Sequence, residues 1–268
     1  MNFRHRLKAM APAALLQWAY PRTMRAFCIG TPKSGTTSIA GIFNVNFRAD
    51  HEPHEREFIA KMREHFRGEV SDDQYVRWLQ IRDKRFWLDM EANCFLGHRP
   101  DLLRRAFPEA KFLLTVRHPE RWLDSVFDNN LNYPATLGPG EAGWHEVLLR
   151  PADFSYSAGD EPLRSVGLYP LAAYLTYWSR SNAEALDTSP TEDVLVVETE
   201  QIDGRRAQIA DFLGIPLESI AQDHGRHNVT TQKHGALATL DPDYVEESIA
   251  SLCGDELARP RIAEALSR

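Results

Sequence analysis

The chain has 268 residues and a net charge of −7, and it is 43% hydrophobic and 26% charged. This composition is typical of a globular protein with a sizeable core, so we expect a single domain over residues 1–268. The negative charge excludes a general attraction to nucleic acid, and no nucleic-acid partner is expected. Three widely spaced cysteines without a CxxC pair suggest neither a disulfide framework nor a cysteine zinc site, and they favour a reducing cytoplasm.

The N-terminal region contains a short apolar stretch, Met10–Tyr20, that follows Arg4, Arg6 and Lys8. It is too short to span a bilayer, which needs about 20 apolar residues. We predict a helix packed against the domain. Contact of this helix with a membrane surface and a cleaved secretory signal are the alternatives.

The first predicted strand, Met24–Gly30, leads through a turn rich in Gly, Pro and Ser into a predicted helix, Thr36–Phe47. This order is typical of a phosphate-binding loop, in which backbone N–H groups and the positive end of the helix face an anion. Nucleotide triphosphatase loops place a lysine directly after the second glycine. Here Gly30 and Gly35 keep the usual spacing, but the lysine is Lys33, so its ammonium reaches the anion from within the loop.

Strand-like and helical segments then alternate. The patterns predict an extended piece at 48–52, a helix ending near Phe66, a helix from the capping box Ser71–Gln74 to Ile81, a strand at Phe86–Asp89, a helix at Leu96–Phe107, a strand at Lys111–Val116 and a helix from Pro119.

The second half is predicted to begin with an irregular insertion or lid at 134–160. After it we expect a long helix at Val166–Leu186, a strand at Val194–Val197, a helix stopped by Gly214 and a last helix capped by Asp241-Pro242. Strands alternating with helices predict an α/β fold, with a parallel sheet flanked by helices on both faces. Ligands of such sheets bind at the carboxyl ends of the strands.

Two stretches resemble the donor site of sulfotransferases that use 3′-phosphoadenosine 5′-phosphosulfate (PAPS). Pro32–Thr37 is similar to their 5′-phosphosulfate loop, and Lys111–Ser125 is similar to their 3′-phosphate site, where a strand is followed by Arg-x-Pro and a helix. The resemblance implies a P-loop NTPase-like fold and PAPS as donor, without a metal. The donor-binding residues that it implies are Lys33, Ser34, Gly35, Thr36, Thr37, Arg117, Ser125 and, from a late loop, Lys233.

Sulfuryl transfer needs a cation at the leaving group and a base at the acceptor. Lys33 is predicted to stabilise the charge that develops on the bridging oxygen as its bond to sulfur breaks. The acceptor hydroxyl must lose a proton, and the resemblance implies a Glu or His base. We assign this role to Glu52, with His51 as the alternative base and a solvated turn as the non-catalytic alternative.

Further acidic and histidine residues are weaker candidates. We expect Asp89 and Glu91 to line the acceptor pocket, although Asp89 also fits a strand cap or the magnesium ligand of a kinase. Glu198, near another strand end, is either a cap or a site residue. No metal site is predicted, because no helix face and no cysteine partner brings together His224, His227 and His234.

The sequence therefore predicts in-line transfer of a sulfuryl group from PAPS to a hydroxyl of a sugar, glycolipid or small natural product. Eukaryotic Golgi sulfotransferases carry a membrane anchor, and its absence here favours a bacterial cytoplasmic enzyme. A small-molecule kinase using ATP and magnesium is the alternative, and a catalytically silent nucleotide-binding protein is the third possibility. The acceptor and the oligomeric state stay open.

Overall fold

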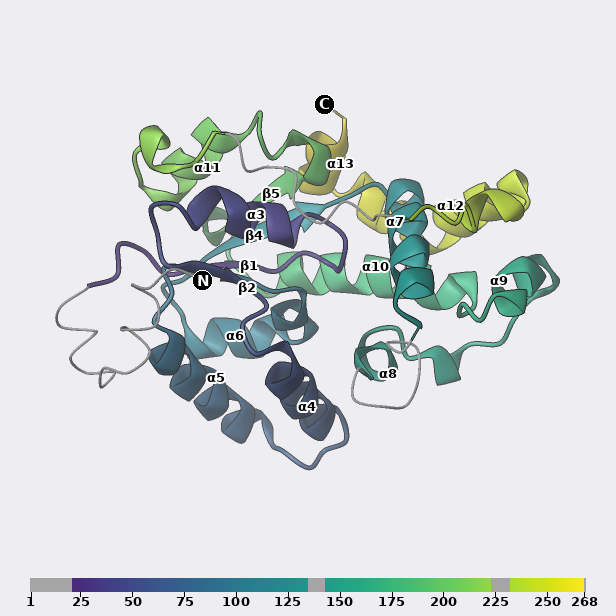
Figure 1. The fold of residues 1–268 in the computed structure, drawn as a ribbon, viewed down its shortest axis with the longest axis horizontal. Coiled ribbons are helices and arrows are strands. Elements are labelled where there is room, and N and C mark those ends of the chain that lie inside the picture. Colours follow the sequence, from purple (N-terminus) through teal and green to yellow (C-terminus); the bar gives the residue numbers. More distant parts are fainter. Residues whose placement is uncertain (1–20, 135–142, 223–231, 268) are drawn as a thin grey trace.

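A computed structural model describes residues 21–134, 143–222 and 232–267. It contains one five-stranded parallel sheet with the strand order β2-β3-β1-β4-β5 (Figure 1). The strands are β1 (Ala26–Cys28), β2 (Ala49–His51), β3 (Met90–Ala92), β4 (Lys111–Val116) and β5 (Val194–Glu198). The expected α/β fold is confirmed. The predicted N-terminal helix lies outside the described residues.

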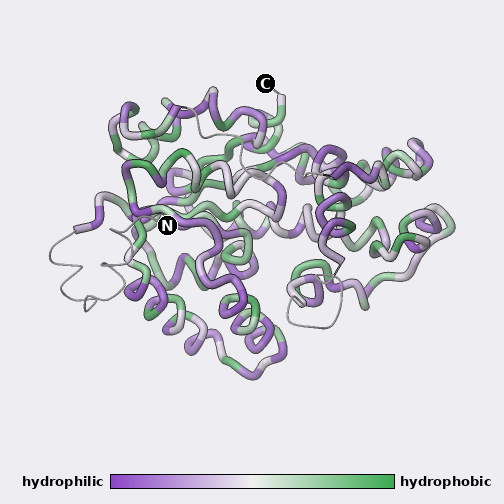
Figure 2. The backbone as a smooth tube through the Cα atoms, viewed as in Figure 1, coloured by the Kyte–Doolittle hydropathy of each residue, from purple (hydrophilic) through white to green (hydrophobic). Residues whose placement is uncertain are grey.

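Helices cover both faces of the sheet (Figure 1). Successive strand residues point to opposite faces, so Phe27 belongs to one hydrophobic core and Cys28 to the other. The core around Cys28 is closed by α3 (Thr36–Phe43) and α11 (Arg206–Leu213). The larger core around Phe27 is closed by α4 (Glu55–Phe66), α5 (Asp72–Phe86), α6 (Pro100–Ala106), α7 (Pro119–Asn132) and α10 (Leu171–Asp187). Figure 2 shows hydrophilic and hydrophobic residues alternating along α4 and α5, as expected for helices that bury one side.

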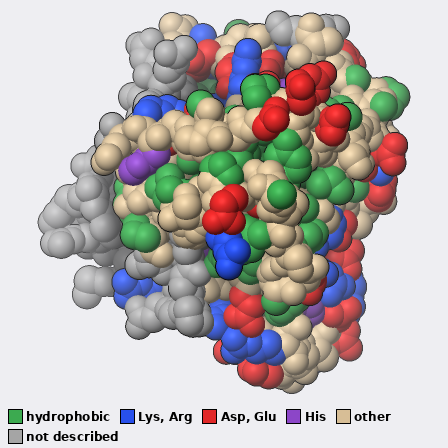
Figure 3. Space-filling model, turned by 90° about the vertical axis from the view of Figure 1, so that its right-hand side faces the viewer, with side chains coloured by type: hydrophobic (Ala, Val, Ile, Leu, Met, Phe, Trp, Pro, Cys, Tyr) green, Lys and Arg blue, Asp and Glu red, His purple; other side chains and the backbone are tan. Residues whose placement is uncertain are grey.

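The other described α-helices are α8 (Trp144–Leu148), α9 (Glu161–Ser165), α12 (Pro242–Ala258) and α13 (Pro260–Leu266). Acidic and basic side chains are interspersed on the side of the molecule that carries α9 (Figure 3). Within the described ranges, no helix is both long and apolar enough to cross a membrane.

Local signals predicted several helix ends correctly. The Ser71 hydroxyl accepts a hydrogen bond from the Gln74 N–H, and the Gln74 side chain accepts one from the Ser71 N–H, which forms the expected capping box of α5. Gly214 ends α11 with a φ of 66°, a conformation that favours glycine. Asp241 caps α12 by accepting a hydrogen bond of 2.9 Å from the Asp243 N–H.

The predicted strand at Phe86–Asp89 is wrong. The preceding helix, α5, passes its expected end at Ile81 and continues to Phe86, whose ring lies 4.8 Å from the Arg82 guanidinium. Trp87 then ends the helix with a φ of 51°. The strand β3 begins only at Met90.

Two predicted helices also differ from the structure. The segment Leu96–Phe107 divides into a 3₁₀ turn, Cys94–His98, and α6, because Pro100 has no N–H to continue a helix and occupies a first turn instead. The helix expected at Val166–Leu186 begins only at Leu171, since the residue before it is an extended proline with a ψ of 142°.

Candidate active site

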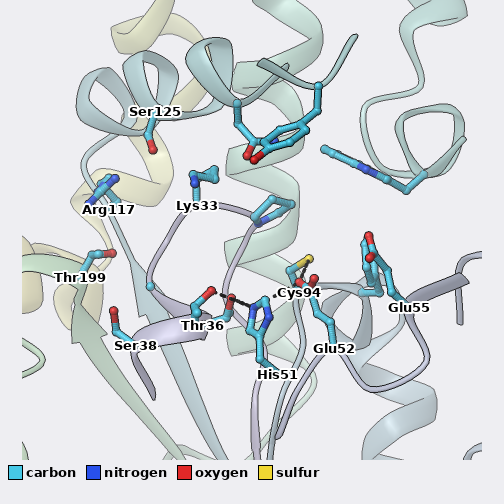
Figure 4. Close-up of a pocket in the computed structure, with 17 residues that line it drawn as sticks. Lys33, Thr36, Ser38, His51, Glu52, Glu55, Cys94, Arg117, Ser125 and Thr199 are labelled. Carbon is cyan, nitrogen blue, oxygen red and sulfur yellow. Dashed lines mark hydrogen bonds and ion pairs between the residues drawn. The ribbon is translucent and has the colours of Figure 1, made fainter. Parts of the chain in front are cut away.

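A pocket of about 440 Å³ opens at the carboxyl ends of the strands (Figure 4). The segment after every strand contributes to its lining: Lys33 follows β1, Glu52 β2, Cys94 β3, Arg117 β4 and Thr199 β5. Open parallel sheets bind ligands at this edge, because loops from all the strands converge there. The structure thus places the pocket where the sequence predicted a site.

The loop between β1 and α3 is tightly held. A Cβ atom at Gly30 would lie 2.0 Å from the Thr115 hydroxyl oxygen, so the loop requires glycine there. Gly35 precedes α3 with a φ of 98°. The Ser34 side chain is buried and donates a hydrogen bond of 2.6 Å to the Thr31 carbonyl, so the hydroxyl braces the loop and does not line the pocket. The predicted donor residues of this loop that do line it are Lys33, Gly35, Thr36 and Thr37.

Two cations lie at one end of the pocket. Lys33 adopts a φ of 65°, which is rare for a residue with a side chain. Burial, and then the charge of Arg117, lower the pKa of Lys33. Arg117 forms an ion pair with Glu200, 2.9 Å from its Nε atom, and Ser125 lies beside it on α7 (Figure 4). Because neighbouring cations repel each other, this end of the pocket favours a bound anion.

Lys233 does not line the pocket. Its ammonium pairs with Asp124 at 2.8 Å and with Asp128 at 2.9 Å, both on α7. The residue therefore lies against the helix that carries Ser125, but in this arrangement it does not form the expected clamp over a phosphate.

His51 is a neutral hydrogen-bonding residue. Its Nε2 atom lies 3.1 Å from the hydroxyl oxygens of both Thr36 and Thr37. Burial, and then the charge of Lys33, lower the pKa of His51 to about 4. The ring is uncharged at neutral pH, so it can orient two loop hydroxyls without adding a charge to the pocket.

Glu52 lies across the pocket from Arg117 and Ser125 (Figure 4). Burial raises the pKa of Glu52 to about 7, while the hydrogen bond from the Cys94 thiol and the charge of Lys33 act in the opposite direction. The thiol donates to Oε1 at a distance of 3.0 Å. A carboxyl group with such a pKa can exchange a proton with a ligand near neutral pH.

Asp89 and Glu91 do not line the pocket, which corrects the prediction. Asp89 precedes β3, at the amino end of the strands, and pairs there with Arg48 at 2.9 Å. Glu91 lies within β3 and is buried against Arg82 at 2.5 Å. Glu198, the last residue of β5, is also absent from the lining. Because Asp89 is at the opposite end of the sheet, the kinase alternative loses its only supporting residue.

Sequence reasoning missed several lining residues, among them Thr199, Cys94 and Trp144. The Thr199 hydroxyl oxygen lies 2.6 Å from the Ser34 carbonyl oxygen and ties the end of β5 to the loop after β1. Its position two residues after a predicted strand was a signal that could have identified it. No such signal marked Cys94, because the strand before it was predicted wrongly at Phe86–Asp89. None marked Trp144, because it lies in the segment 134–160, for which no regular element was predicted. Residues 135–142 of that segment are outside the described residues, and Trp144 begins α8.

Within the described part of the chain, no group of three or more His, Cys, Asp or Glu side chains is arranged to hold a metal ion. His234 interacts with Asn132 at 3.0 Å. His224 and His227 lie outside the described residues.

Residues 25–220 match the model of the sulfotransferase domain family. These residues include every described strand and the whole pocket lining. The chain therefore belongs to the sulfotransferase family, as the resemblance of Pro32–Thr37 and Lys111–Ser125 had suggested. Family membership supports sulfuryl transfer as the activity. No sequence among the curated proteins matches the chain.

Three solved sulfotransferase structures resemble this one. A sulfotransferase from Alicyclobacillus acidocaldarius has 18% identity and a TM-score of 0.48, with 91% of this chain and 96% of that chain covered. A sulfotransferase domain from the curacin biosynthetic pathway has 14% identity and a TM-score of 0.38, with 92% of this chain and 98% of that chain covered. A sulfotransferase domain from the Synechococcus PCC 7002 olefin synthase has 13% identity and a TM-score of 0.39, with 92% of this chain and 93% of that chain covered. Because these scores are below 0.5, family membership rests on the domain match alone.

Proposed function

We propose that this sulfotransferase takes its sulfuryl group from PAPS and transfers it to a hydroxyl acceptor. One observation carries the proposal: Lys33, Arg117 and Ser125 line one side of a single pocket, and Glu52 lines the other (Figure 4). Cations on one side suit a doubly phosphorylated donor, and a carboxyl group with a pKa of about 7 on the other side suits an acceptor that must lose a proton.

The donor is proposed to lie between the start of α3 and α7. Thr36, Thr37 and the backbone N–H groups around them would bind the 5′-phosphosulfate, because a helix N-terminus carries unpaired donors and a positive dipole end. Arg117 and Ser125 would bind the 3′-phosphate, since a guanidinium matches the geometry of phosphate oxygens.

The proposed reaction is an in-line displacement at sulfur. The acceptor oxygen forms a bond to sulfur while the bond between sulfur and the bridging phosphate oxygen breaks. Negative charge grows on that bridging oxygen, where the Lys33 ammonium stabilises it more strongly than in the ground state. The hydroxyl proton passes to Glu52, and the products are a sulfate ester and 3′-phosphoadenosine 5′-phosphate (PAP).

Glu52 is a better candidate base than His51. Both side chains line the pocket, and their Oε1 and Nε2 atoms are 3.5 Å apart. The pKa of Glu52 is about 7, close to the value at which a general base is most effective, whereas that of His51 is about 4. The hydrogen bonds of His51 to the loop hydroxyls instead suggest that it orients the donor loop.

Calorimetric titration with PAP, compared with ATP and magnesium, tests the donor assignment. The proposal expects a dissociation constant for PAP of about 1 μM or lower, with little binding of ATP. The reverse preference would overturn it in favour of a kinase. Radiolabelled PAPS incubated with sugars, aliphatic alcohols and phenols then identifies the acceptor class. Tight PAP binding without transfer to any of these compounds would favour a catalytically silent protein.

A further inference from the structure

A buried ion pair lies behind the pocket, between α5 and β3. The Arg82 Nη1 atom is 2.5 Å from Glu91 Oε2, and both residues are only 4% exposed. Neither residue lines the pocket. Buried ion pairs are a weak source of stability, because desolvation of both charges offsets their attraction and well-packed apolar residues often replace them without loss. The groups that each side chain of the pair holds in place are therefore of more interest than its contribution to stability.

The Arg82 side of the pair leads to the turn that carries Glu52. The Arg82 Nη2 atom donates a hydrogen bond of 2.9 Å to the Pro53 carbonyl, directly after Glu52 in the chain. On either side of Pro53, Glu52 and His54 adopt φ values of 48° and 55°. Two residues with side chains in this region strain the backbone, and such a turn persists only where its surroundings hold it. Arg82 holds this turn at its centre.

The Glu91 side of the pair leads to the same carboxylate by a second route. Glu91 Oε1 accepts a hydrogen bond of 2.9 Å from the Asn93 side chain. Asn93 in turn accepts a hydrogen bond of 3.0 Å from the Phe95 N–H, which fixes the start of the 3₁₀ turn. The first residue of that turn is Cys94, whose thiol donates to Glu52 Oε1.

We propose that the Arg82–Glu91 pair is a positioning device that holds the Glu52 carboxylate in the pocket. Its two hydrogen-bonded routes approach Glu52 from the backbone turn and from the thiol. Arg82 and Glu91 act through other residues and touch neither donor nor acceptor. The inference rests on the proposed function in one respect, the role of Glu52 as the general base.

The position of Glu52 controls how its carboxyl group ionises. The charged or titratable groups that face it are Lys33 from the loop after β1, His51 from β2, Glu55 from α4 and Cys94 from the 3₁₀ turn. Burial is the dominant influence, so a turn that relaxes toward water returns the carboxyl group toward its ordinary pKa of 4.5.

A direct test is the titration of Glu52 by NMR in protein labelled with ¹³C at the glutamate carboxyl groups. The Glu52→Gln variant assigns the signal. The wild-type midpoint is expected at about 7. The double variant Arg82→Met, Glu91→Gln removes both charges, so no buried charge is left unpaired. Its midpoint is expected to fall toward 4.5, whereas Cys94→Ala alone is expected to raise the midpoint, because the thiol hydrogen bond favours the ionised form.

A neighbouring ion pair supplies the matched control. Arg22 and Asp83 are 2.7 Å apart with side chains 8% and 10% exposed, and Asp83 is the residue after Arg82 on α5. The double variant Arg22→Met, Asp83→Asn is expected to leave the Glu52 midpoint unchanged. An equal shift in this control would show general loosening and would overturn the inference. So would an unchanged midpoint in the Arg82 and Glu91 variant.

Two further measurements keep the test decisive. If the double variant does not fold, Arg82→Lys replaces it, since a lysine can pair with Glu91 but cannot also reach the Pro53 carbonyl as a planar fork does. PAP titration of the two double variants and of Arg82→Lys is expected to give affinities within about twofold of wild type, because none of the substituted residues lines the pocket. Failure of wild-type protein to bind PAP would refute the proposed function, while the Glu52 titration would still decide the positioning role.

Discussion

The indole Nε1 of Trp122 donates a hydrogen bond of 2.7 Å to the Pro32 carbonyl. This contact joins α7, which carries Ser125, to the loop that carries Lys33. The two proposed phosphate-binding regions are therefore connected directly and not only through the sheet. A donor that bridges them meets groups whose separation is already set, which reduces the entropy lost on binding.

The Trp122–Pro32 contact can be removed without removing the aromatic ring. Trp122→Phe is expected to weaken PAP binding by at most about tenfold, because the loop and α7 lose a contact worth about 0.5–1.5 kcal/mol that sets their separation before the ligand binds. Calorimetry measures the affinity, and thermal unfolding shows how much stability the smaller ring costs. Unchanged PAP affinity would mean that the loop and α7 hold their positions independently.

Lys33 is expected to act mainly on the transition state. Lys33→Ala should lower the rate of sulfuryl transfer about 10²–10³-fold, with a smaller loss of PAP affinity, because the charge it stabilises appears only as the bond to sulfur breaks. Single-turnover assays with radiolabelled PAPS separate the two effects. Lys111→Ala is the control. Lys111 is the first residue of β4, at the end of the strand away from the pocket, and it pairs there with Asp193. Turnover that survives the loss of Lys33 would refute the assigned role.

Arg117 is expected to distinguish ligands by the 3′-phosphate. Arg117→Ala should weaken PAP binding about 10-fold to 100-fold, the range for a lost hydrogen bond to a charged group. Binding of adenosine 5′-phosphosulfate, which lacks that phosphate, should barely change. Competition titrations with both ligands measure the difference. An equal loss for both would indicate a distorted pocket and not a lost phosphate contact.

Glu52 is expected to reduce stability above neutral pH. Its carboxyl group has a pKa of about 7 in the folded protein and 4.5 when unperturbed, so the folded state holds the proton more tightly. The tighter binding of this proton adds to the free energy of unfolding. The added free energy is complete below pH 4.5 and is lost as the pH rises to 7, a change of at most about 3 kcal/mol. Glu52→Gln should therefore be more stable than wild type at pH 8 and similar to it at pH 4.5. Urea unfolding at both pH values measures this, and an equal difference at both would contradict the raised pKa.

Much of the proposed donor side could be predicted from the sequence, because local segments encode the positions of its residues in the pocket. Gly30, Lys33 and Gly35 lie within one turn, and Arg117 follows the longest strand, so neighbouring residues were sufficient to place them. The inward rotation of the Ser34 hydroxyl was not predictable, since its surroundings include Thr115, which is distant in the chain.

The proposed acceptor side depends on contacts between distant segments. Glu52 owes its environment to Cys94, 42 residues later, and Glu91 is turned away from the pocket by Arg82 on a preceding helix. The strand that carries Glu91 has only three residues, too few for an alternating pattern to mark its beginning. That is why Asp89 and Glu91 were assigned to the pocket when one lies at the far end of the sheet and the other points into the core.

The strand order has a consequence for how the proposed enzyme can diversify. The proposed donor residues follow β1 and β4, which are neighbours, whereas Glu52 follows β2, on the outer edge beyond β3. In the proposed reaction the sulfuryl group therefore moves toward one border of the sheet, away from the nucleotide. Substitutions along α4 and α8 can reshape the acceptor side while the loops that hold the nucleotide stay intact. Under the proposed function, residues that recognise the donor and residues that select the acceptor can thus vary separately within one sheet.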